Sequence, residues 1–303
     1  MAGRRPRTSV VAVSLCAVLA TGACGDLEAL RGSQHTVLVT ATVTTVTPST
    51  HVQGGVAEDE LTAVVTENPD AAPTGALDAV VSGMPGPSGI AVLPVGGRGE
   101  LARAGSWGSG VAWSTIKVPL AIAVDRVDPS ALSGATSAIT ASDNAAAERL
   151  WAALGGGAAA SASVRQILVE GGDGVTQVPS TTTRPGSSVF GQSHWSLTDQ
   201  ARFGSELPCL AGADRVVDLM GRVSPDQSWG LGRIPGARFK GGWGPGQTGG
   251  YLVRQFGLVP AAGGDVVVAI AVEADSFAGG TAALSRMADA LAPLLDTVNG
   301  GRC

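Results

Sequence analysis

The amino-acid sequence predicts an α+β fold of the α/β-sandwich type. We expect a five-stranded antiparallel sheet formed by both ends of the folded region, with flanking helices and a mostly helical second lobe. Strand patterns, followed by helical patterns and then strand patterns again, place both ends in one sheet. A helix at 281–298 closes the chain. The expected strands are 88–95, 98–104, 238–243, 250–259 and 265–273.

The first residues predict export. Three arginines precede an apolar run at 10–20, and no further charge occurs before Asp26. The run is shorter than the roughly 20 residues that span a bilayer, so residues 1–23 are interpreted as a signal peptide. The small residues before Cys24 resemble a bacterial lipoprotein cleavage box. We expect an exported protein held at the extracytoplasmic face of the membrane by a lipid on Cys24; the alternative is an ordinary secretory signal with a chance cysteine.

Residues 24–75 predict a stalk rather than a packed domain, because the segment is rich in threonine and contains proline. An alternative is that its alternating run at 36–47 adds an edge strand to the domain. We expect the folded domain at 76–303, beginning with a short helix at 76–81.

The middle of the domain predicts helices separated by glycine-rich turns. Residues 128–134 are expected to form a loop, and residues 171–195 a long surface loop. The expected helices are 114–125, 144–154, 162–170, 197–210 and 214–220.

Ser114 and Lys117 carry the first chemical signal. Residues three apart share one face of a helix, so a hydroxyl and an amine can meet at the start of the 114–125 helix. There the helix dipole opposes a charged amine. A lysine that loses its proton can serve as the base for a serine nucleophile.

The lysine content strengthens this interpretation. Of the 20 basic residues, 18 are arginines, and the only lysines are Lys117 and Lys240. Arginine does not give up its proton, whereas lysine can. Both lysines are therefore candidates for positions that need a titratable amine, although a lysine lying along a helix surface is the plain alternative for Lys117.

Three short motifs follow one another along the chain. They are Ser114-x-x-Lys117, Ser142-Asp143-Asn144 and Lys240-Gly241-Gly242. With one substitution, this set resembles the Ser-x-x-Lys, Ser-Asp-Asn and Lys-Thr-Gly motifs of class A β-lactamases and penicillin-binding proteins. The resemblance extends over residues 76–298 and implies the same α+β fold.

The resemblance also implies roles for the first two motifs. Ser114 would be the acylated nucleophile and Lys117 its base. Ser142 would pass a proton to the leaving nitrogen, and Asn144 would hold the substrate amide and Lys117. Asp143 would be structural, with a buried carboxylate that bonds backbone amides.

For the third motif, the resemblance implies that Lys240, Gly242 and Trp243 bind the substrate. Lys240, at the edge of the cleft, would attract a substrate carboxylate and favour a neutral Lys117 by like-charge repulsion. The backbone amides of Ser114 and Trp243 would form the oxyanion hole.

The chain departs from the family pattern in three places. Gly241 replaces the hydroxyl residue of the third motif. The 28 positions from Ser114 to Ser142 are fewer than in typical class A enzymes. Residues 174–198 contain no acidic residue that could match the deacylating glutamate. We therefore expect weak or absent deacylation.

Composition excludes some classes of function. The chain has 303 residues and a net charge of -5, and it has no basic stripe, so nucleic-acid binding is not expected. The histidines and cysteines lack zinc-ligand spacing, and we expect neither a metal nor a cofactor. Cys209 and Cys303 are candidates for a disulfide in an exported domain. The sequence does not indicate an oligomeric state.

Two main hypotheses of function follow. The first is a serine acyl-transfer protein that acts on a peptidoglycan-peptide-like or β-lactam substrate. The second is a catalytically inactive lipoprotein of the same fold that works as a binding or scaffold module in the cell envelope. A third possibility is an esterase of small esters.

Overall fold

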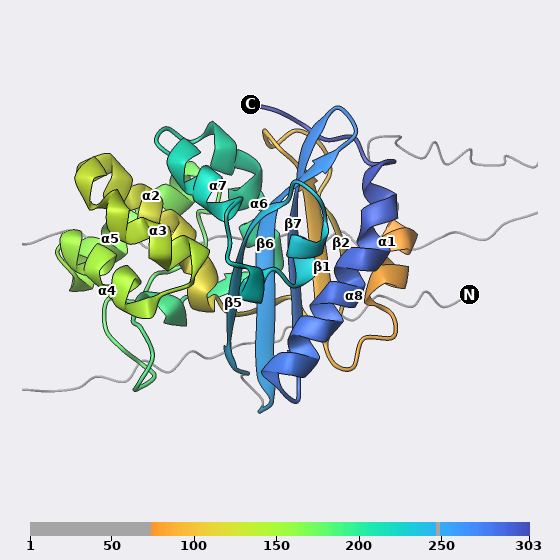
Figure 1. Cartoon of the computed structure of the whole chain (residues 1–303), viewed down its shortest axis with the longest axis horizontal. Coiled ribbons are helices and arrows are strands. Elements are labelled where there is room, and N and C mark those ends of the chain that lie inside the picture. Colours follow the sequence, from red (N-terminus) through yellow and green to blue (C-terminus); the bar gives the residue numbers. More distant parts are fainter. Residues whose placement is uncertain (1–73, 247–248) are drawn as a thin grey trace, which may run out of the picture. The chain divides into compact units, whose positions relative to one another are not determined.

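The computed structural model describes residues 74–246 and 249–303. Its centre is a five-stranded antiparallel sheet with the strand order β2-β1-β7-β6-β5 (Figure 1). The predicted α+β fold is confirmed. The predicted signal peptide, the predicted lipid site at Cys24 and residues 24–73 of the predicted stalk lie outside the described residues; its last two positions, 74–75, begin α1. The strands of this sheet are β1 (Ser88–Pro94), β2 (Ala102–Gly105), β5 (Arg238–Pro245), β6 (Tyr251–Ala261) and β7 (Gly264–Ala274).

Helices lie on both sides of this sheet, and short 3₁₀ turns link several of them (Figure 1). The α-helices are α1 (Thr74–Val81), α2 (Lys117–Val127), α3 (Leu132–Thr140), α4 (Asn144–Ala153), α5 (Gly157–Glu170), α6 (Leu197–Glu206), α7 (Asp214–Met220) and α8 (Phe277–Leu295). The 3₁₀ turns are η1 (Trp113–Ile116), η2 (Pro129–Ala131), η3 (Phe190–Gln192), η4 (Leu207–Cys209), η5 (Pro225–Gln227) and η6 (Gly230–Arg233).

Strand β7 shows why its sequence is continuously apolar. Val266, Val268 and Ile270 belong to the core between the sheet and the layer of α1 and α8. Val267 and Ala269, which alternate with them, belong to the core on the helical-lobe side. Successive side chains of a strand point to opposite faces, so a strand covered on both faces is apolar at every position.

The helical lobe contains two features that the sequence interpretation missed. Part of the expected loop at 128–134 is helical, since α3 begins at Leu132. The expected surface loop at 171–195 ends in β4 (His194–Ser196), which pairs with β3 (Ser109–Val111) in a second, two-stranded sheet. Trp195 in this strand is fully buried. This pairing holds the segment before Ser114 against the start of α6.

The start of the Ser-Lys helix also differs from the prediction. Ser114 lies in the 3₁₀ turn η1, and the α-helix begins only at Lys117. Pro119 therefore falls in the first turn of α2, where its missing N–H removes no intrahelical hydrogen bond. The nucleophile candidate thus lies just before the helix, and the amine lies on its first residue.

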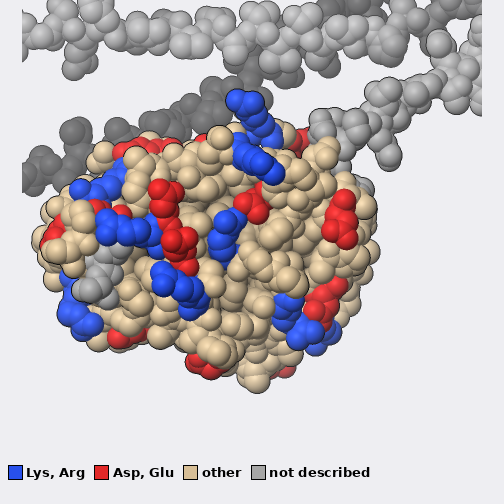
Figure 2. Space-filling model, turned by 45° about the horizontal axis from the view of Figure 1, so that its top comes forward, with Lys and Arg blue, Asp and Glu red and all other residues tan. Residues whose placement is uncertain are grey.

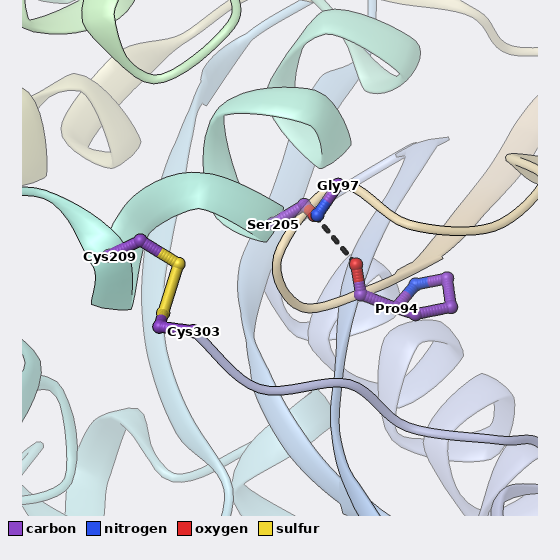
Figure 3. Close-up of a disulfide and its surroundings, with 5 residues drawn as sticks. All are labelled: Pro94, Gly97, Ser205, Cys209 and Cys303. Carbon is purple, nitrogen blue, oxygen red and sulfur yellow. Dashed lines mark hydrogen bonds between the residues drawn. A yellow bond between two sulfur atoms is a disulfide. The ribbon is translucent and has the colours of Figure 1, made fainter.

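A disulfide joins Cys209 and Cys303, whose Cα atoms are 5.3 Å apart. Figure 3 shows it beside the contacts that hold the end of α6 to the end of β1. There the Ser205 hydroxyl donates to Pro94 O at 2.6 Å and accepts from Gly97 N at 2.8 Å. The C-terminal segment is thereby tied to the junction of sheet and helical lobe.

Charges on the face seen in Figure 2 are mixed, with acidic and basic side chains interspersed among neutral ones. No basic stripe appears on that face. In the described ranges, no helix combines the length and the apolar character needed to cross a membrane.

The disulfide predicts a measurable contribution to stability. It joins residues 94 positions apart, and cross-links that close long loops restrict the unfolded chain. We expect Cys209→Ala/Cys303→Ala to lower the free energy of unfolding by about 2–4 kcal/mol, measured by urea denaturation against the oxidised wild type. An unchanged denaturation midpoint would show that the bond does not constrain the chain.

Candidate active site

A pocket of about 670 Å³ brings the first two motifs together. It lies where η1, α2 and α4 of the helical lobe meet the ends of β5 and β6 and the 182–191 segment. Its lining consists of Trp113, Ser114, Lys117, Ser142, Asn144, Ala145, Glu148, Thr182, Gly186, Ser187, Ser188, Phe190, Gly191, Trp243, Gly244, Pro245 and Tyr251.

Ser114 is held on a strained turn. Trp113, the residue before it, has φ +50°, a conformation that costs a bulky residue free energy and that concentrates at functional sites. The turn is pinned by Thr115, whose hydroxyl donates to Ala112 O at 2.6 Å. The Ser114 side chain is half-buried and makes no hydrogen bond to any described residue. Its hydroxyl is therefore held at the pocket without a competing partner.

The turn before Ser114 rests on a buried arginine. Arg254 on β6 is fully buried, and it donates to Gly110 O at 3.1 Å and to Gln200 Oε1 at 2.8 Å. Gln200 donates onward to the Thr115 hydroxyl at 3.1 Å. Burial lowers the pKa of Arg254 to about 9. This network joins the central sheet to η1 through hydrogen bonds alone.

Lys117 has only 1% of its surface exposed, and its amine is committed to two acceptors. It donates to Ser142 O at 2.6 Å and to Asn144 Oδ1 at 2.8 Å. The two predicted motifs therefore meet directly, but the amine bonds the second motif rather than the Ser114 hydroxyl. Burial lowers the pKa of Lys117 to about 8, although the charges of Asp143 and Glu148 act in the opposite direction.

Ser142 connects both lysines. It has φ +56°, the second positive φ at a non-glycine residue in the described ranges. Its hydroxyl accepts from Lys240 Nζ at 2.8 Å, while its carbonyl accepts from Lys117. Burial lowers the pKa of Lys240 well below its usual value, and the nearby charge of Lys117 lowers it further.

Lys240 differs from its expected place at the edge of the cleft. Its side chain is fully buried and does not line the pocket. Besides Ser142, it donates to the neighbouring Gly241 O at 2.9 Å. Lys240 therefore contacts the Ser142 hydroxyl from the side away from the pocket. In this position it can orient that hydroxyl, but it does not face a substrate carboxylate in the pocket.

Asp143 caps α4, accepting a hydrogen bond from Ala146 N at 3.1 Å. This backbone hydrogen bond is the main reason that the pKa of Asp143 is lowered. Its side chain is only partly buried, less than the family resemblance implied. The cap explains how Asn144, the first residue of α4, comes to face Lys117.

Positions 241 and 242 are occupied by glycine for different steric reasons. A Cβ on Gly242 would lie 2.8 Å from Ala112 O and 2.9 Å from Ser114 N, so β5 can approach η1 only with glycine there. A Cβ on Gly241 would lie 3.0 Å from the Trp229 ring. Trp229 thus fills the space beside the position where the family has a hydroxyl residue.

Aromatic rings form the wall of the pocket on the β5 side. Trp243 packs edge-on against Trp229, with ring centroids 5.9 Å apart. Both rings contact Phe277, and so does Tyr251. Since Trp243 and Tyr251 also line the pocket, this wall is built of packed aromatic rings.

The 182–191 segment forms the opposite wall and is organised by Gln192. The Gln192 amide accepts from Thr183 N at 2.8 Å and from Arg184 N at 2.7 Å, and donates to Ser187 O at 3.0 Å. Arg184 then stacks on Trp113 at 5.4 Å and donates to Pro245 O at 3.2 Å. The segment therefore reaches from the nucleophile turn to the end of β5.

None of the carboxylates that flank the 174–198 region lines the pocket. Glu170 pairs with Arg126, and Asp199 pairs with Arg202. Asp173 accepts from Thr176 N at 2.9 Å, and Glu206 lies near a different cavity. The structure therefore adds no general base from this part of the chain.

Glu148 is a charged pocket residue that the sequence interpretation missed, as it also missed the polar Thr182, Ser187, Ser188 and Tyr251. It lies on α4 and contributes a carboxylate to the lining. Its spacing was a usable signal, because residues four apart share a helix face and Glu148 follows Asn144 by four positions.

Another cavity, of about 550 Å³, lies along β2 and β1. Its lining includes Ser106 but neither lysine, so it lacks the paired nucleophile and amine. Within 74–246 and 249–303, no three His, Cys, Asp or Glu side chains gather closely enough to hold a metal ion.

Comparisons with known proteins address the fold. No protein-family model matches the chain, and no curated protein matches it either. Solved structures do match. A variant of the reconstructed last common ancestor of Gram-negative class A β-lactamases is 22% identical, covering 76% of this chain and 100% of its own, with a TM-score of 0.55.

Two other β-lactamase structures match the chain with similar coverage and the same TM-score. One, from Xanthomonas campestris, is 18% identical over 73% of this chain and 96% of its own, with a TM-score of 0.55. The other, from Sphaerobacter thermophilus, is 20% identical over 73% and 95%, also with a TM-score of 0.55. The chain has the class A β-lactamase fold. At these identities the likeness establishes the fold alone.

Gly241 and Gly242, two neighbouring glycines of β5, provide a matched test of the close approach to Ser114. Gly242→Ala must push η1 away, and a displacement of about 1 Å at a reacting group can cost on the order of 10²-fold in rate. Gly241→Ala requires only a small shift of the Trp229 ring. We expect Gly242→Ala to slow acylation by an activated ester on the order of 10²-fold, and Gly241→Ala to leave the rate close to wild type. Equal effects in two variants of wild-type thermal stability would contradict this geometry.

Proposed function

We propose that the protein is an extracytoplasmic serine acyl-transfer protein of the β-lactamase and penicillin-binding type. Ser114 is the nucleophile and Lys117 its base, and the substrate is a peptidoglycan-peptide-like molecule or a β-lactam. The observation that carries the proposal is the half-buried Ser114 in one pocket with a buried amine whose pKa is lowered to about 8. At pH 7 about a tenth of such an amine is neutral and able to accept a proton.

In the proposed acylation, neutral Lys117 takes the proton of the Ser114 hydroxyl. Ser114 Oγ then attacks the carbonyl carbon, and the carbon–nitrogen bond of the substrate breaks. Ser142 gives its hydroxyl proton to the departing nitrogen, and the proton held by Lys117 replaces it. Catalytic hydrogen bonds often tighten only in the substrate complex, which is consistent with a Ser114 hydroxyl that is unbonded beforehand.

The surrounding groups support this sequence of steps. Asn144 binds Lys117 at 2.8 Å, which keeps the amine directed at the second motif. Lys240 donates to the Ser142 hydroxyl at 2.8 Å, so we assign it to orienting Ser142. The backbone amides of Ser114 and Trp243 are proposed as the oxyanion hole, with the Trp243 ring and Gly242 shaping the substrate side.

Deacylation is proposed to be weak. A positioned general base contributes about 10²–10⁴-fold to a rate. The 182–191 wall supplies no carboxylate, and we assign Glu148, the carboxylate that α4 adds to the pocket, to binding rather than to activating water. The acyl-enzyme would then persist. The proposed place of action, the outer face of the membrane, depends on lipidation of Cys24.

A second candidate is a binding or scaffold module of the cell envelope. It is favoured by the amine of Lys117, which bonds Ser142 and Asn144 instead of Ser114. In this case the pocket binds a ligand and no covalent bond forms.

Intact-mass measurement separates the two candidates. We expect the purified protein, incubated with benzylpenicillin, to gain the full mass of the penicillin and to retain it for longer than the acylation takes. Ser114→Ala should show no adduct, whereas Ser187→Ala, which removes another pocket hydroxyl, should still form it. The absence of any adduct with benzylpenicillin and with an activated ester would leave the binding module.

The acylation rate should depend on pH through Lys117. Its pKa is lowered to about 8, so the neutral form increases as the pH rises through that value and the rate should rise with it. Stopped-flow measurement across this range tests the expectation. Lys117→Arg should abolish acylation, because arginine keeps its proton. A rate that stays flat through this range would exclude Lys117 as the base.

A further inference from the structure

Glu148 places in the pocket a carboxylate that no described side chain bonds, although its charge also raises the pKa of Lys117. It is exposed, on α4, and lines the same pocket as Ser114 and Lys117. In the described part of the chain, its carboxylate has no hydrogen bond and no ion pair within 4.0 Å. An unpaired carboxylate directed at a pocket is a site for a positively charged group on a ligand.

The lysines leave this charge available. Lys117 donates its hydrogen bonds to Ser142 O and Asn144 Oδ1 rather than to Glu148. Lys240 is fully buried behind Ser142. Among the described residues that line the pocket, Lys117 and Glu148 are the only charged ones. The residues that line the pocket therefore offer an exposed anion but no exposed cation. Arg184, in the 182–191 wall, is held by the Trp113 ring and Pro245 O.

Helix geometry gives the position of this charge relative to the reacting groups. Glu148 follows Asn144 by four residues on α4, so the two side chains are neighbours on one face, one turn apart. Under the proposed function, Asn144 holds the amide of the acyl part of the substrate. A group carried one helical turn beyond that amide would meet the Glu148 carboxylate.

The rest of the pocket agrees with a ligand that is cationic on this side. Trp229 fills the space beside Gly241, and Trp243 and Tyr251 present an apolar wall. Exposed arginine or lysine, the usual partners of a ligand carboxylate, is absent from the described lining. The charge pattern thus points to recognition on the acyl side of the substrate.

We propose that Glu148 binds a protonated amine on the acyl part of the substrate, and that the natural substrate is an amine-bearing acyl donor. This proposal rests on the proposed acyl-transfer function for the orientation of the substrate. The binding contact itself requires no covalent step, so it can be tested separately from acylation.

Two penicillins make a matched pair of probes. Ampicillin and benzylpenicillin differ by one amino group on the acyl side chain. An exposed ion pair contributes up to about 1 kcal/mol. We therefore expect the ratio of the acylation rate with ampicillin to that with benzylpenicillin to be about three- to fivefold higher in wild type than in Glu148→Gln. Glu100→Gln, which removes an exposed carboxylate from the other cavity, should retain the wild-type ratio.

The same preference should appear in equilibrium binding when no acyl bond can form. We expect full-length Ser114→Ala to bind ampicillin about three- to fivefold more tightly than benzylpenicillin, measured by titration calorimetry, and Ser114→Ala/Glu148→Gln to lose the difference. If wild type forms no adduct but this binding preference is present, the acyl-transfer proposal fails and the amine site stands.

Two results would overturn the amine site. One is equal binding of the two penicillins to Ser114→Ala, with no change on Glu148→Gln. The other is a Glu148→Gln variant in which both adducts persist longer while the ratio of acylation rates stays at the wild-type value. That result would make Glu148 a base for the attacking water rather than a binding group.

Discussion

Two buried amines share one serine, and this constraint organises the site. Lys117 donates to the carbonyl of Ser142 and Lys240 to its hydroxyl. Burial disfavours the charge on each amine, and the charge of Lys117 also disfavours a charge on Lys240. The pKa of the fully buried Lys240 is lowered well below its usual value, and the pKa of Lys117 is lowered to about 8. The like-charge repulsion expected to neutralise Lys117 acts instead on Lys240, whose pKa the charge of Lys117 lowers. Besides burial, the groups that act on the pKa of Lys117 are the carboxylates of Asp143 and Glu148, which raise it. The pKa of Lys117 therefore lies close to neutral pH, where an amine can both accept and return a proton.

The scaffold holds this arrangement through a close contact and a buried network. Strand β5 approaches η1 so closely at Gly242 that a Cβ would meet the backbone of Ala112 and Ser114. From the other side, Arg254 and Gln200 connect β6 to Thr115. The strain at Trp113 is maintained because both flanks of the turn are fixed. Sheet and helical lobe therefore cannot shift independently without moving Ser114, which is why a site assembled from distant segments stays together.

Much of the fold could be predicted, because alternation along the strands and the order of elements are local signals. Two features could not. The residues of α3 are mostly weak helix formers, and the β3–β4 pair joins three-residue strands whose paired positions are 83 to 87 apart. The site, too, contains features that could be predicted from the sequence and features that could not. The motifs predicted Ser114, Lys117, Ser142 and Asn144 as neighbours, and the pocket brings them together. The burial of Lys240 and the Trp229 ring beside Gly241 depend on packing between distant segments, which no local pattern encodes. Glu148 could have been predicted, because it follows Asn144 by four positions and therefore shares its helix face.

The lysine content makes the central claim directly measurable. Because the chain has only Lys117 and Lys240, selective ¹³C labelling of the lysine ε-carbon gives two resonances, which Lys117→Arg and Lys240→Met assign. The account predicts that the Lys117 resonance titrates at about pH 8 and that the Lys240 resonance titrates far below the usual range of an amine. Two resonances that both titrate near the ordinary lysine pKa of about 10.4 would contradict the account, because neither amine could then serve as a base at neutral pH.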